Sequence, residues 1–328
     1  MTTYKGIRGL TIQTVAGDIS NIALGDIWYN NVSRAIKVGQ TIAGAWASGG
    51  TMNTARNNGG GCGTQTALLA VAGAPSSKAN VEEYNGTAWS EQADVPSACT
   101  TNSVGGIQTS ALSFGGAPGV RTESFEYDGS SWGSEADMNT GRNESTGSGA
   151  TNTAAMVMGG QTPPVTVDTE TYDGSSWTET GDLNTARNKS GGLGTTTATL
   201  CIGSPGGPGA LVEDWNGTSW TEVGDTNTGR SEAGHMAGGS TTAGLMAGGY
   251  IPGGATGGPA ETGNVESYNG TSWTEIANLS LTRYGTYGGG TLALGIVAGG
   301  VAEAGGGNTG VTEEWTDAYV GAGTVSSS

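Results

Sequence analysis

One stretch recurs along this chain, and its clearest copy is WNGTSWTEVGDTNTGR at Trp215–Arg230. The other full copies are Tyr84–Cys99, Tyr127–Arg142, Tyr172–Arg187 and Tyr268–Arg283; partial copies are Trp46–Arg56 and Glu313–Tyr319. The tryptophans at matching positions are separated by 43 to 53 residues; they are Trp46, Trp89, Trp132, Trp177, Trp220 and Trp273. A repeat of this length indicates a fold built from similar units that bury their faces against one another.

Each full copy contains a predicted β-hairpin. It reads aromatic, Asn or Asp, Gly, two small polar residues and Trp, and an Asn-Gly or Asp-Gly step between strand formers favours a two-residue type I′ loop. With Asn85–Gly86 as that loop, Tyr84 would face Thr87, and Glu82 would face Trp89. Because side chains alternate along a strand, we expect Glu82, Tyr84 and Trp89 on one face.

Two more extended segments precede each hairpin. The first is rich in glycine, as at Gly191–Gly194, and the second combines Thr with small apolar residues and ends at a glycine pair, as at Ala154–Gly160. Each unit therefore has four short strands, here called a, b, c and d. Four-stranded units at this period predict a β-propeller, with the glycine-rich strand a innermost, where the blades converge.

Counting the elements gives six blades. The chain enters on a strand d at Trp46 and leaves after a strand c at Trp315, so these two strands are expected to complete one sheet and close the ring. The alternative is a separate last strand around Ala318–Val320, which would leave Trp46 outside the ring. The predicted fold class is all-β: a six-bladed β-propeller of four-stranded blades with a short N-terminal β segment.

Arginine and glutamate recur at two fixed positions of the repeat. Only the second blade departs, with Cys99 in place of Arg and Phe125 in place of Glu. An unpaired buried charge is costly, so joint loss of both residues predicts an ion pair within each remaining blade, with a structural role. The expected pairs are Arg56 with Glu82, Arg142 with Glu170, Arg187 with Glu213, Arg230 with Glu266 and Arg283 with Glu313.

From Trp46 to Trp315 the repeat resembles the kelch repeat. The resemblance is carried by the paired glycines after strand b, the Tyr…Trp spacing and the Met/Leu-Asn-Thr-x-Arg motif, as in Met138–Arg142. It implies a kelch-like propeller. Galactose oxidase has a kelch propeller but needs more than one histidine for copper, and His235 is the one histidine here. We therefore expect no cofactor and no metal, and a channel-lining or structural role for His235 on strand a.

Residues 1–44 do not follow the repeat and are expected to form an attachment segment, with the propeller at 45–320 and a C-terminal tail at 321–328. The segment contains Gly25–Asn30 (GDIWYN) and Ala35–Val38, which read as a hairpin. It resembles GDIWYN-type segments of bacteriophage tail-fibre and other virion proteins. Combined with the YNGTSW units, it looks like hypothetical structural proteins of marine phages, including cyanophages. The resemblance implies virion attachment through Ile27, Trp28 and Tyr29; the alternative is a plug or lid on the propeller.

Composition excludes several classes of function. The net charge is −17, with only 12 Lys and Arg in 328 residues, and five of the arginines belong to the predicted pairs, so nucleic-acid binding is not expected. No stretch approaches the roughly 20 apolar residues of a membrane span, so no membrane insertion is expected. The N-terminus lacks the apolar region of a signal peptide. Three cysteines, Cys62, Cys99 and Cys201, fall in three different blades and predict reduced core residues.

The longest loops lie between strands b and c of blades 5 and 6. If the protein binds a receptor, these loops are the expected site, with Tyr250 as the residue that stacks on a sugar. The candidate binding residues are Tyr250, Ile251, Glu261 and Asn264 in blade 5, and Glu303 and Asn308 in blade 6. Because strand direction alternates within a blade, the N-terminal segment is expected on the opposite face, beside the hairpins between strands c and d.

These observations predict a non-enzymatic virion structural protein on a phage tail or capsid, made in the host cytoplasm, that decorates the particle or adheres to the host surface. Its expected partners are other virion proteins, bound through the N-terminal segment, further copies of itself on the particle, and a host glycan or protein. One alternative is a carbohydrate-active enzyme that uses loop carboxylates, although spacing singles out no pair. The other is an intracellular protein–protein interaction scaffold.

Overall fold

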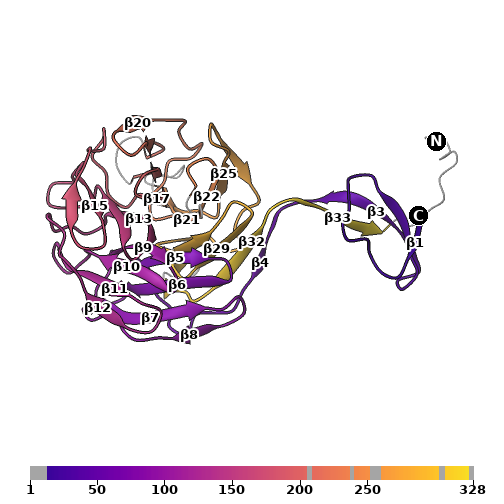
Figure 1. Cartoon of the computed structure of the whole chain (residues 1–328), viewed down its shortest axis with the longest axis horizontal. Helices are drawn as coiled ribbons and strands as arrows, with labels where there is room; N and C mark the ends of the chain where they lie inside the picture. The colour runs from indigo at the N-terminus through magenta and orange to yellow at the C-terminus, as the bar shows by residue number, and fades with distance from the viewer. Residues whose placement is uncertain (1–12, 205–208, 237–239, 252–259, 303–306, 325–328) are drawn as a thin grey trace. The chain divides into compact units, whose positions relative to one another are not determined.

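The computed structural model describes residues 13–204, 209–236, 240–251, 260–302 and 307–324. The chain divides into two compact units: Trp46–Thr316, and a smaller unit made of Met1–Ala45 together with Asp317–Ser328. Every regular element in the described ranges is a β-strand. The structure confirms the predicted fold class, because the larger unit consists of six four-stranded antiparallel sheets that succeed one another around a ring (Figure 1).

Each blade has the order a, b, c, d from the axis outwards. Blade 1 is β5 (Gly60–Thr64), β6 (Ala67–Gly73), β7 (Lys78–Tyr84) and β8 (Trp89–Glu91). Blade 2 is β9 (Ser103–Ile107), β10 (Ser110–Phe114), β11 (Ser124–Tyr127) and β12 (Trp132–Ser134). Blade 3 is β13 (Thr146–Thr151), β14 (Ala154–Met158), β15 (Thr169–Tyr172) and β16 (Trp177–Glu179).

The other three blades repeat this order. Blade 4 is β17 (Gly191–Gly194), β18 (Thr199–Ile202), β19 (Val212–Trp215) and β20 (Trp220–Glu222). Blade 5 is β21 (Gly234–Met236), β22 (Gly244–Ala247), β25 (Val265–Tyr268) and β26 (Trp273–Ile276). Blade 6 is β28 (Tyr287–Gly290), β29 (Leu294–Ala298), β32 (Thr312–Thr316) and β4 (Ala45–Ser48).

The ring closes where the sequence predicted. Strand β4 pairs with β32, so the first strand of the ring completes the sheet of the last, and Trp46 packs on Trp315 with ring centroids 5.5 Å apart. The Gln65 side chain of blade 1 also donates to the carbonyls of Gly295 and Trp315 in blade 6, at 3.1 and 2.6 Å. The alternative with Trp46 outside the ring is therefore wrong.

The core lies between the blades. Six clusters of buried apolar side chains each span two neighbouring blades, and one of them joins Leu68 and Trp89 of blade 1 to Ile296 of blade 6. A single four-stranded sheet cannot cover both of its faces, so burial is complete only when all neighbours are in place. Blade-to-blade packing is therefore the main source of stability.

The hairpin register differs from the prediction. Tyr84 pairs with Trp89, and Glu82 with Glu91, so four residues rather than two connect the strands. The Asn85 side-chain oxygen accepts hydrogen bonds from the backbone N–H groups of Thr87 and Ala88, at 3.0 and 2.9 Å. This Asx turn stabilises a longer loop than the type I′ turn, which would need positive φ at Asn85 as well as at Gly86. The expected shared face of Glu82, Tyr84 and Trp89 is retained.

The innermost strands approach one another closely enough to require glycine. A Cβ atom at Gly191 in blade 4 would lie 1.9 Å from Cε1 of His235 in blade 5, so the imidazole occupies the space that a side chain would need. Val104 of blade 2 covers Gly60 of blade 1 in the same way, at 2.1 Å from Cγ2. Large side chains on the inner strands are thus accommodated by glycine on the preceding blade.

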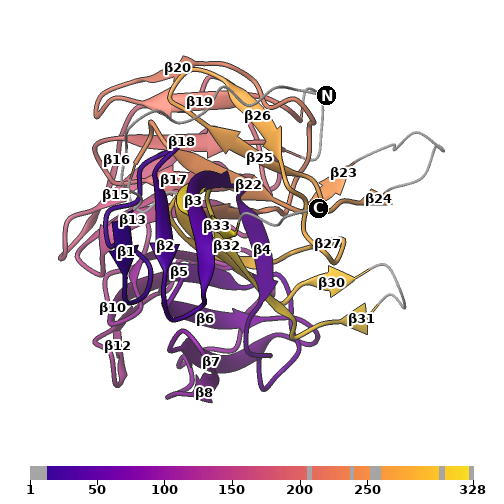
Figure 2. The same ribbon diagram turned by 90° about the vertical axis from the view of Figure 1, so that its right-hand side faces the viewer.

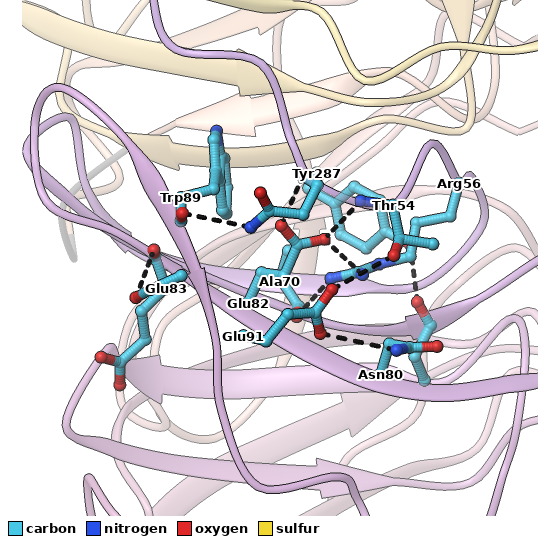
Figure 3. Close-up of polar contacts among 12 residues, drawn as sticks. Thr54, Arg56, Ala70, Asn80, Glu82, Glu83, Trp89, Glu91 and Tyr287 are labelled. Carbon is cyan, nitrogen blue, oxygen red and sulfur yellow. Dashed lines mark hydrogen bonds and ion pairs between the residues drawn. The ribbon is translucent and has the colours of Figure 1, made fainter.

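The predicted arginine–glutamate pairs lie inside the blades. The distances are 2.7 Å for Arg56–Glu82, 2.5 Å for Arg142–Glu170, 3.0 Å for Arg230–Glu266 and 3.1 Å for Arg283–Glu313; Arg187 and Glu213 are also paired. In blade 1 the Glu82 carboxylate also accepts the N–H groups of Asn53 and Thr54, at 2.7 and 3.2 Å (Figure 3). The Asn-Thr-x-Arg motif therefore supplies both the counter-ion and the hydrogen bonds that a buried carboxylate needs.

In blade 2 an apolar contact replaces the ion pair. Cys99 is buried, and Phe125 packs against the same cluster, which includes Val81 and Tyr127. The three cysteines, Cys62, Cys99 and Cys201, are free and buried. Burial raises the pKa of the Cys62 thiol to about 12 and that of Cys99 to about 11, which keeps both thiols protonated at neutral pH.

Short hairpins extend from the connections between strands b and c. In blade 5 they are β23 (Tyr250–Ile251) and β24 (Ala260–Glu261); in blade 6, β30 (Val301–Ala302) and β31 (Gly307–Asn308), with β27 (Arg283–Tyr284) beside β30. Figure 2 shows the two hairpins on the same side of the ring. The connections that lead from strand d of one blade to strand a of the next lie beside these hairpins; for example, Ser231 forms a β-bridge with Tyr250. We call this face the loop side.

The smaller unit is one four-stranded sheet built from both ends of the chain. It contains β1 (Gln13–Val15), β2 (Ile27–Asn30), β3 (Ala35–Ile42) and β33 (Tyr319–Thr324) in that order. The predicted tail at 321–328 and the ring boundary at 320 are therefore wrong, because β33 pairs with β3 along six residues, from Lys37 opposite Thr324 to Ile42 opposite Tyr319. The small residues of β33 are poor strand formers alone, and the long β3 supplies the missing partner.

Candidate functional site

The blade 5 residues chosen for binding come together on one hairpin. Tyr250 pairs with Glu261 across β23 and β24, and Ile251 follows Tyr250 on the same strand. All three are half-buried. Tyr250 already packs edge-to-face on Tyr284, with ring centroids 5.4 Å apart, so it is not a free stacking platform.

The remaining predicted loop residues have structural roles where they are described. The side-chain oxygen of Asn264 accepts a hydrogen bond of 3.4 Å from Asn278, and its carbonyl accepts the N–H of Gly248. Asn308 donates to the carbonyl of Ala74 in blade 1, at 3.0 Å, and so helps to close the ring. Glu303 lies outside the described residues.

The three candidate attachment residues occupy the small sheet. Ile27 is 42% exposed, Trp28 is buried and Tyr29 is half-buried. The register pairs Ile27 with Val38, and Tyr29 with Ile36, so these four side chains share one face, while Trp28 points to the other. Trp28 is therefore a core residue of the small unit, and only its neighbours face outwards.

The most regular feature of the loop side is a closed circle of backbone hydrogen bonds around the axis. Each donor N–H comes from the residue two positions after the repeat's Arg (or Cys99), and each acceptor is the equivalent carbonyl of the preceding blade. We call these six residues the mouth ring: Asn58, Thr101, Glu144, Lys189, Glu232 and Gly285. The six N···O distances lie between 2.6 and 3.2 Å, and the last bond, from Asn58 to Gly285, closes the circle.

All six residues of the mouth ring have left-handed backbone conformations. Their φ values are 48° at Asn58, 54° at Thr101, 51° at Glu144, 53° at Lys189, 53° at Glu232 and 64° at Gly285. Five are not glycine, and each such residue carries a conformational cost of about 1 kcal/mol or more. Strained positions that recur in every blade indicate that the geometry of the mouth is maintained by the whole fold.

Lys189 is the cationic member of this ring and lies between two glutamates, Glu144 and Glu232. Its Nζ lies 2.8 Å from Glu232 and 3.5 Å from Glu144, so one ammonium bridges the carboxylates of both neighbouring blades. Burial lowers the pKa of Lys189, but pairing with Glu232 and Glu144 outweighs this effect and raises it above its usual value. Lys189 is therefore a permanent cation at the mouth.

Two adjoining cavities lie beneath the ring. The first, which we call the mouth cavity, has a volume of about 120 Å³ and is lined by Thr101, Asn102, Glu144, Lys189, Glu232 and Thr286, among others. The second, of about 130 Å³, shares Asn102 and Thr286 with it and reaches His235. A third cavity of about 460 Å³ continues along the axis between the glycine-rich strands.

Several polar atoms that line these cavities are buried without a hydrogen-bond partner. They are Thr101 Oγ1, Asn102 Oδ1, Glu232 Oε2 and Thr286 Oγ1 around the mouth cavity, with His235 Nε2 below them. Asn102 as a whole is 6% exposed, and its amide nitrogen is already used in a 2.9 Å bond to Ser113. Buried polar groups are normally satisfied, so this cluster indicates a place for a polar ligand or water.

His235 lies on β21, where it lines the axial cavities, in keeping with the channel-lining role expected for it. Burial, and then the charge of Arg230, lowers the pKa of His235 to about 4. The imidazole is therefore neutral at physiological pH and can either donate or accept one hydrogen bond at Nε2.

The mouth ring is continuous with the blade 5 hairpin through Tyr284. Burial, and then the charges of Glu232 and Glu261, raises the pKa of the Tyr284 hydroxyl. Since Tyr284 also packs on Tyr250, the predicted loop residues and the mouth ring belong to one region of the loop side. The residues that sequence reasoning missed are Lys189, Glu144 and Glu232, although their fixed offset from the repeat's Arg was visible.

Within the described ranges, no group of three or more His, Cys, Asp or Glu side chains is placed to hold a metal ion. Among the residues that the structure covers, no helix is long and apolar enough to cross a membrane.

Comparison with known proteins supports the fold. No protein-family model matches the chain, and no curated protein matches its sequence. Among solved structures it is similar to that of YjhT, with a TM-score of 0.66, 14% sequence identity, and coverage of 83% of this chain and 99% of that one. At this identity the likeness concerns the propeller fold alone.

Proposed function

We propose that this protein is a non-enzymatic structural protein of a bacteriophage virion, associated with the tail or the capsid. In this proposal the small sheet attaches the protein to other virion proteins. The propeller, of the kelch type by its repeat, either decorates the particle or adheres to a glycan or protein of the host surface. The observation that supports the proposal is the division of the chain into a ring with loops and a separate sheet made from both chain ends.

The surface of the small sheet supports an attachment role. Ile27, Ile36 and Tyr319 are 42%, 41% and 54% exposed, and the register places them on the same face as Tyr29 and Val38. Contiguous exposed apolar side chains are typical of protein–protein contact sites. A sheet of this kind suits a module that is covered after assembly by another virion protein or by a further copy of this chain.

Mass spectrometry of purified virions tests the location directly, because the proposal requires the protein in intact particles. Incorporation should then depend on the apolar face of the small sheet. We expect Ile36→Asp to abolish incorporation while the melting of the propeller is unchanged. Val32→Asp is the matched control, since Val32 is 74% exposed in the turn between β2 and β3 and lies outside the sheet face. Absence of the wild-type protein from virions would refute the proposed location.

A carbohydrate-active enzyme is the second candidate, and one observation favours it. Glu144 and Glu232 line the same cavity, and a hydrolase that uses loop carboxylates needs two acids in one cavity. A glycan-hydrolysis screen separates the candidates. Turnover that is lost in both Glu144→Gln and Glu232→Gln would favour the enzyme, whereas glycan binding without turnover would favour adhesion.

A further inference from the structure

The inference concerns the mouth cavity and deepens the adhesive part of the proposed function, on which it rests. Nine of the twelve residues that line it carry polar side chains (Thr, Asn, Ser, Glu or Lys); the other three are Gly59, Gly285 and Ala233. Four of its polar atoms are buried and have no partner within the protein: Thr101 Oγ1, Asn102 Oδ1, Glu232 Oε2 and Thr286 Oγ1. A ligand that satisfied them would regain the free energy lost by their desolvation.

The unpartnered atoms determine the chemical class of the ligand. Glu232 Oε2 can only accept when ionised, and the two threonine hydroxyls both donate and accept. Lys189, whose ammonium can only donate, lines the same cavity beside Glu232. Several adjacent hydroxyl groups, each able to donate and accept, match this mixture better than a group that only donates or only accepts.

The charged side chains around the cavity narrow the chemical class of the ligand further. An anionic ligand would meet two carboxylates, Glu144 and Glu232, in a protein of net charge −17. A cationic ligand would compete with Lys189, which already lies 2.8 Å from Glu232. The ligand that meets neither obstacle is uncharged.

The size and surroundings of the cavity complete the description. The mouth cavity and the cavity below it, about 120 and 130 Å³, share Asn102 and Thr286 in their linings, so a single sugar ring can extend from one into the other. We infer that the mouth cavity binds a neutral hexose residue, presented as the end of a glycan chain.

An NMR titration of the full-length protein tests this inference. The probes are the methyl glycosides of glucose, galactose and mannose, with glucuronate and glucosamine as charged counterparts. We expect at least one neutral glycoside to shift the backbone amides of Thr101, Asn102, Glu232 and Thr286, and the charged sugars to bind more weakly. If no neutral glycoside shifts these amides, or if a charged sugar binds more tightly, the inference is wrong.

Two substitutions with matched controls assign the site. Glu232→Gln and Thr286→Val should each weaken binding about tenfold, because each removes a hydrogen bond to the ligand. Glu222→Gln and Thr221→Val make the same changes on the outer strand β20, where both side chains are exposed, and should leave binding unchanged. Wild-type affinity in Thr286→Val would contradict the inference even if Glu232→Gln failed to fold.

The test of sugar binding and the test of the proposed virion location can fail independently of each other. Sugar binding in a protein that is absent from virions would refute the location and leave the site in place. A protein found in virions that binds none of the glycosides would refute the site and leave the structural role in place.

Discussion

The hydroxyl of Tyr127 on blade 2 donates a hydrogen bond of 3.0 Å to Oε1 of Glu83 on blade 1. Glu83 directly precedes Tyr84, the aromatic residue of its own strand c. An acid on strand c of one blade therefore accepts a hydrogen bond from the strand c aromatic residue of the next blade. Tyr84 donates to Glu314 of blade 6 in the same way, at 2.5 Å. This contact therefore links the last blade to the first as well as neighbours within the chain.

The strand c aromatic residue of a blade varies together with the residue at the acid position of the preceding blade. The tyrosines Tyr84, Tyr127, Tyr172 and Tyr268 follow blades that carry Glu314, Glu83, Glu126 and Asp214 at this position. Trp215 and Trp315 follow blades that carry Thr171 and Ser267 instead. Tryptophan has no hydroxyl to donate, and each of the two bonds a carbonyl of its own blade, that of Thr196 or Leu292. In two of the four blades with tyrosine this acid accepts the hydrogen bond of the phenol, whereas Tyr172 donates to Glu135 instead, at 2.9 Å.

Tyr127→Phe is expected to lower the free energy of unfolding by about 1.5 to 3 kcal/mol, the value of a hydrogen bond to a charged group. The double variant Tyr127→Phe/Glu83→Gln should lose less than the sum of the two single variants, because the partners interact. Urea denaturation of all three measures the coupling. Glu179→Gln, at an exposed position on β16, is the control and should be neutral. Additive effects of the two changes would contradict the interaction.

The buried ion pairs predict that one substitution lowers stability and that a second substitution restores part of it. Arg187→Cys alone should destabilise the protein by about 3 to 5 kcal/mol, because it leaves the Glu213 carboxylate buried without its counter-ion. Combining it with Glu213→Phe reproduces the Cys99 and Phe125 arrangement of blade 2 and should recover part of this loss. Denaturant unfolding compares the variants. A double variant less stable than Arg187→Cys would show that blade 4 does not tolerate the apolar pair.

The contact between Gly191 and His235 predicts a second rescue. Gly191→Ala should destabilise the protein by about 1 to 3 kcal/mol, because the new Cβ atom would lie 1.9 Å from the imidazole. Adding His235→Gly removes that obstacle and should restore much of the stability. Thermal melting of both variants checks this. Gly133→Ala is the control, since no atom lies within 4 Å of its added Cβ.

Ring closure through β4 predicts how the chain tolerates truncation. Removal of residues 1–44 should leave the ring closed, since β4 and its pairing with β32 remain. Removal of residues 1–48 deletes β4, exposes the edge of β32 and uncovers Trp315, so we expect a lower melting temperature and aggregation. Melting and light scattering of the two truncated proteins test the difference. Equal behaviour would mean that β4 does not contribute to closure.

The single histidine predicts a pH dependence. The pKa of His235 is lowered to about 4 in the folded protein, whereas an unfolded histidine has a pKa of about 6.5. Between these values the unfolded chain binds a proton that the folded chain does not, so the contribution of His235 to stability is present above about pH 6.5 and lost as pH falls toward 4. Unfolding measured across this range should vary less in His235→Gln. An NMR titration of the imidazole gives its pKa directly, and an unshifted value would refute the prediction.

The sequence was sufficient to predict the ring because its repeat marks the same positions in every blade. Arg56 and Glu82 recur together, and the tryptophans count the blades, so architecture, closure and the internal ion pairs followed from spacing. The register of the hairpin between strands c and d was harder to predict from the sequence. Asn85–Gly86 matches two hairpin types, and the Asx turn prevails through side-chain hydrogen bonds that the residue pair alone does not specify.

The candidate site was harder to predict from the sequence than the ring, and for a different reason from the hairpin register. The mouth ring is defined by backbone conformation, and its side chains vary among the blades, with only Glu144 and Glu232 alike, so no motif marks Lys189 or Glu232. Loop length pointed instead to the blade 5 and blade 6 connections, where Asn264 accepts a hydrogen bond from Asn278 and Asn308 donates one to the carbonyl of Ala74 in blade 1. A last strand around Ala318–Val320 was considered only as an alternative end of the ring. Its pairing with β3 was not predicted, because the repeat carries no information about the N-terminal segment that lies outside it.

The circle of six amide–carbonyl bonds has no first or last member, and none of its atoms belongs to a side chain. The size of the opening is therefore set by the backbone circle rather than by the side chains around it. Any residue that keeps its amide N–H and tolerates the left-handed φ can therefore stand at these six positions, so substitutions there can change which ligand the opening admits while the backbone circle is retained.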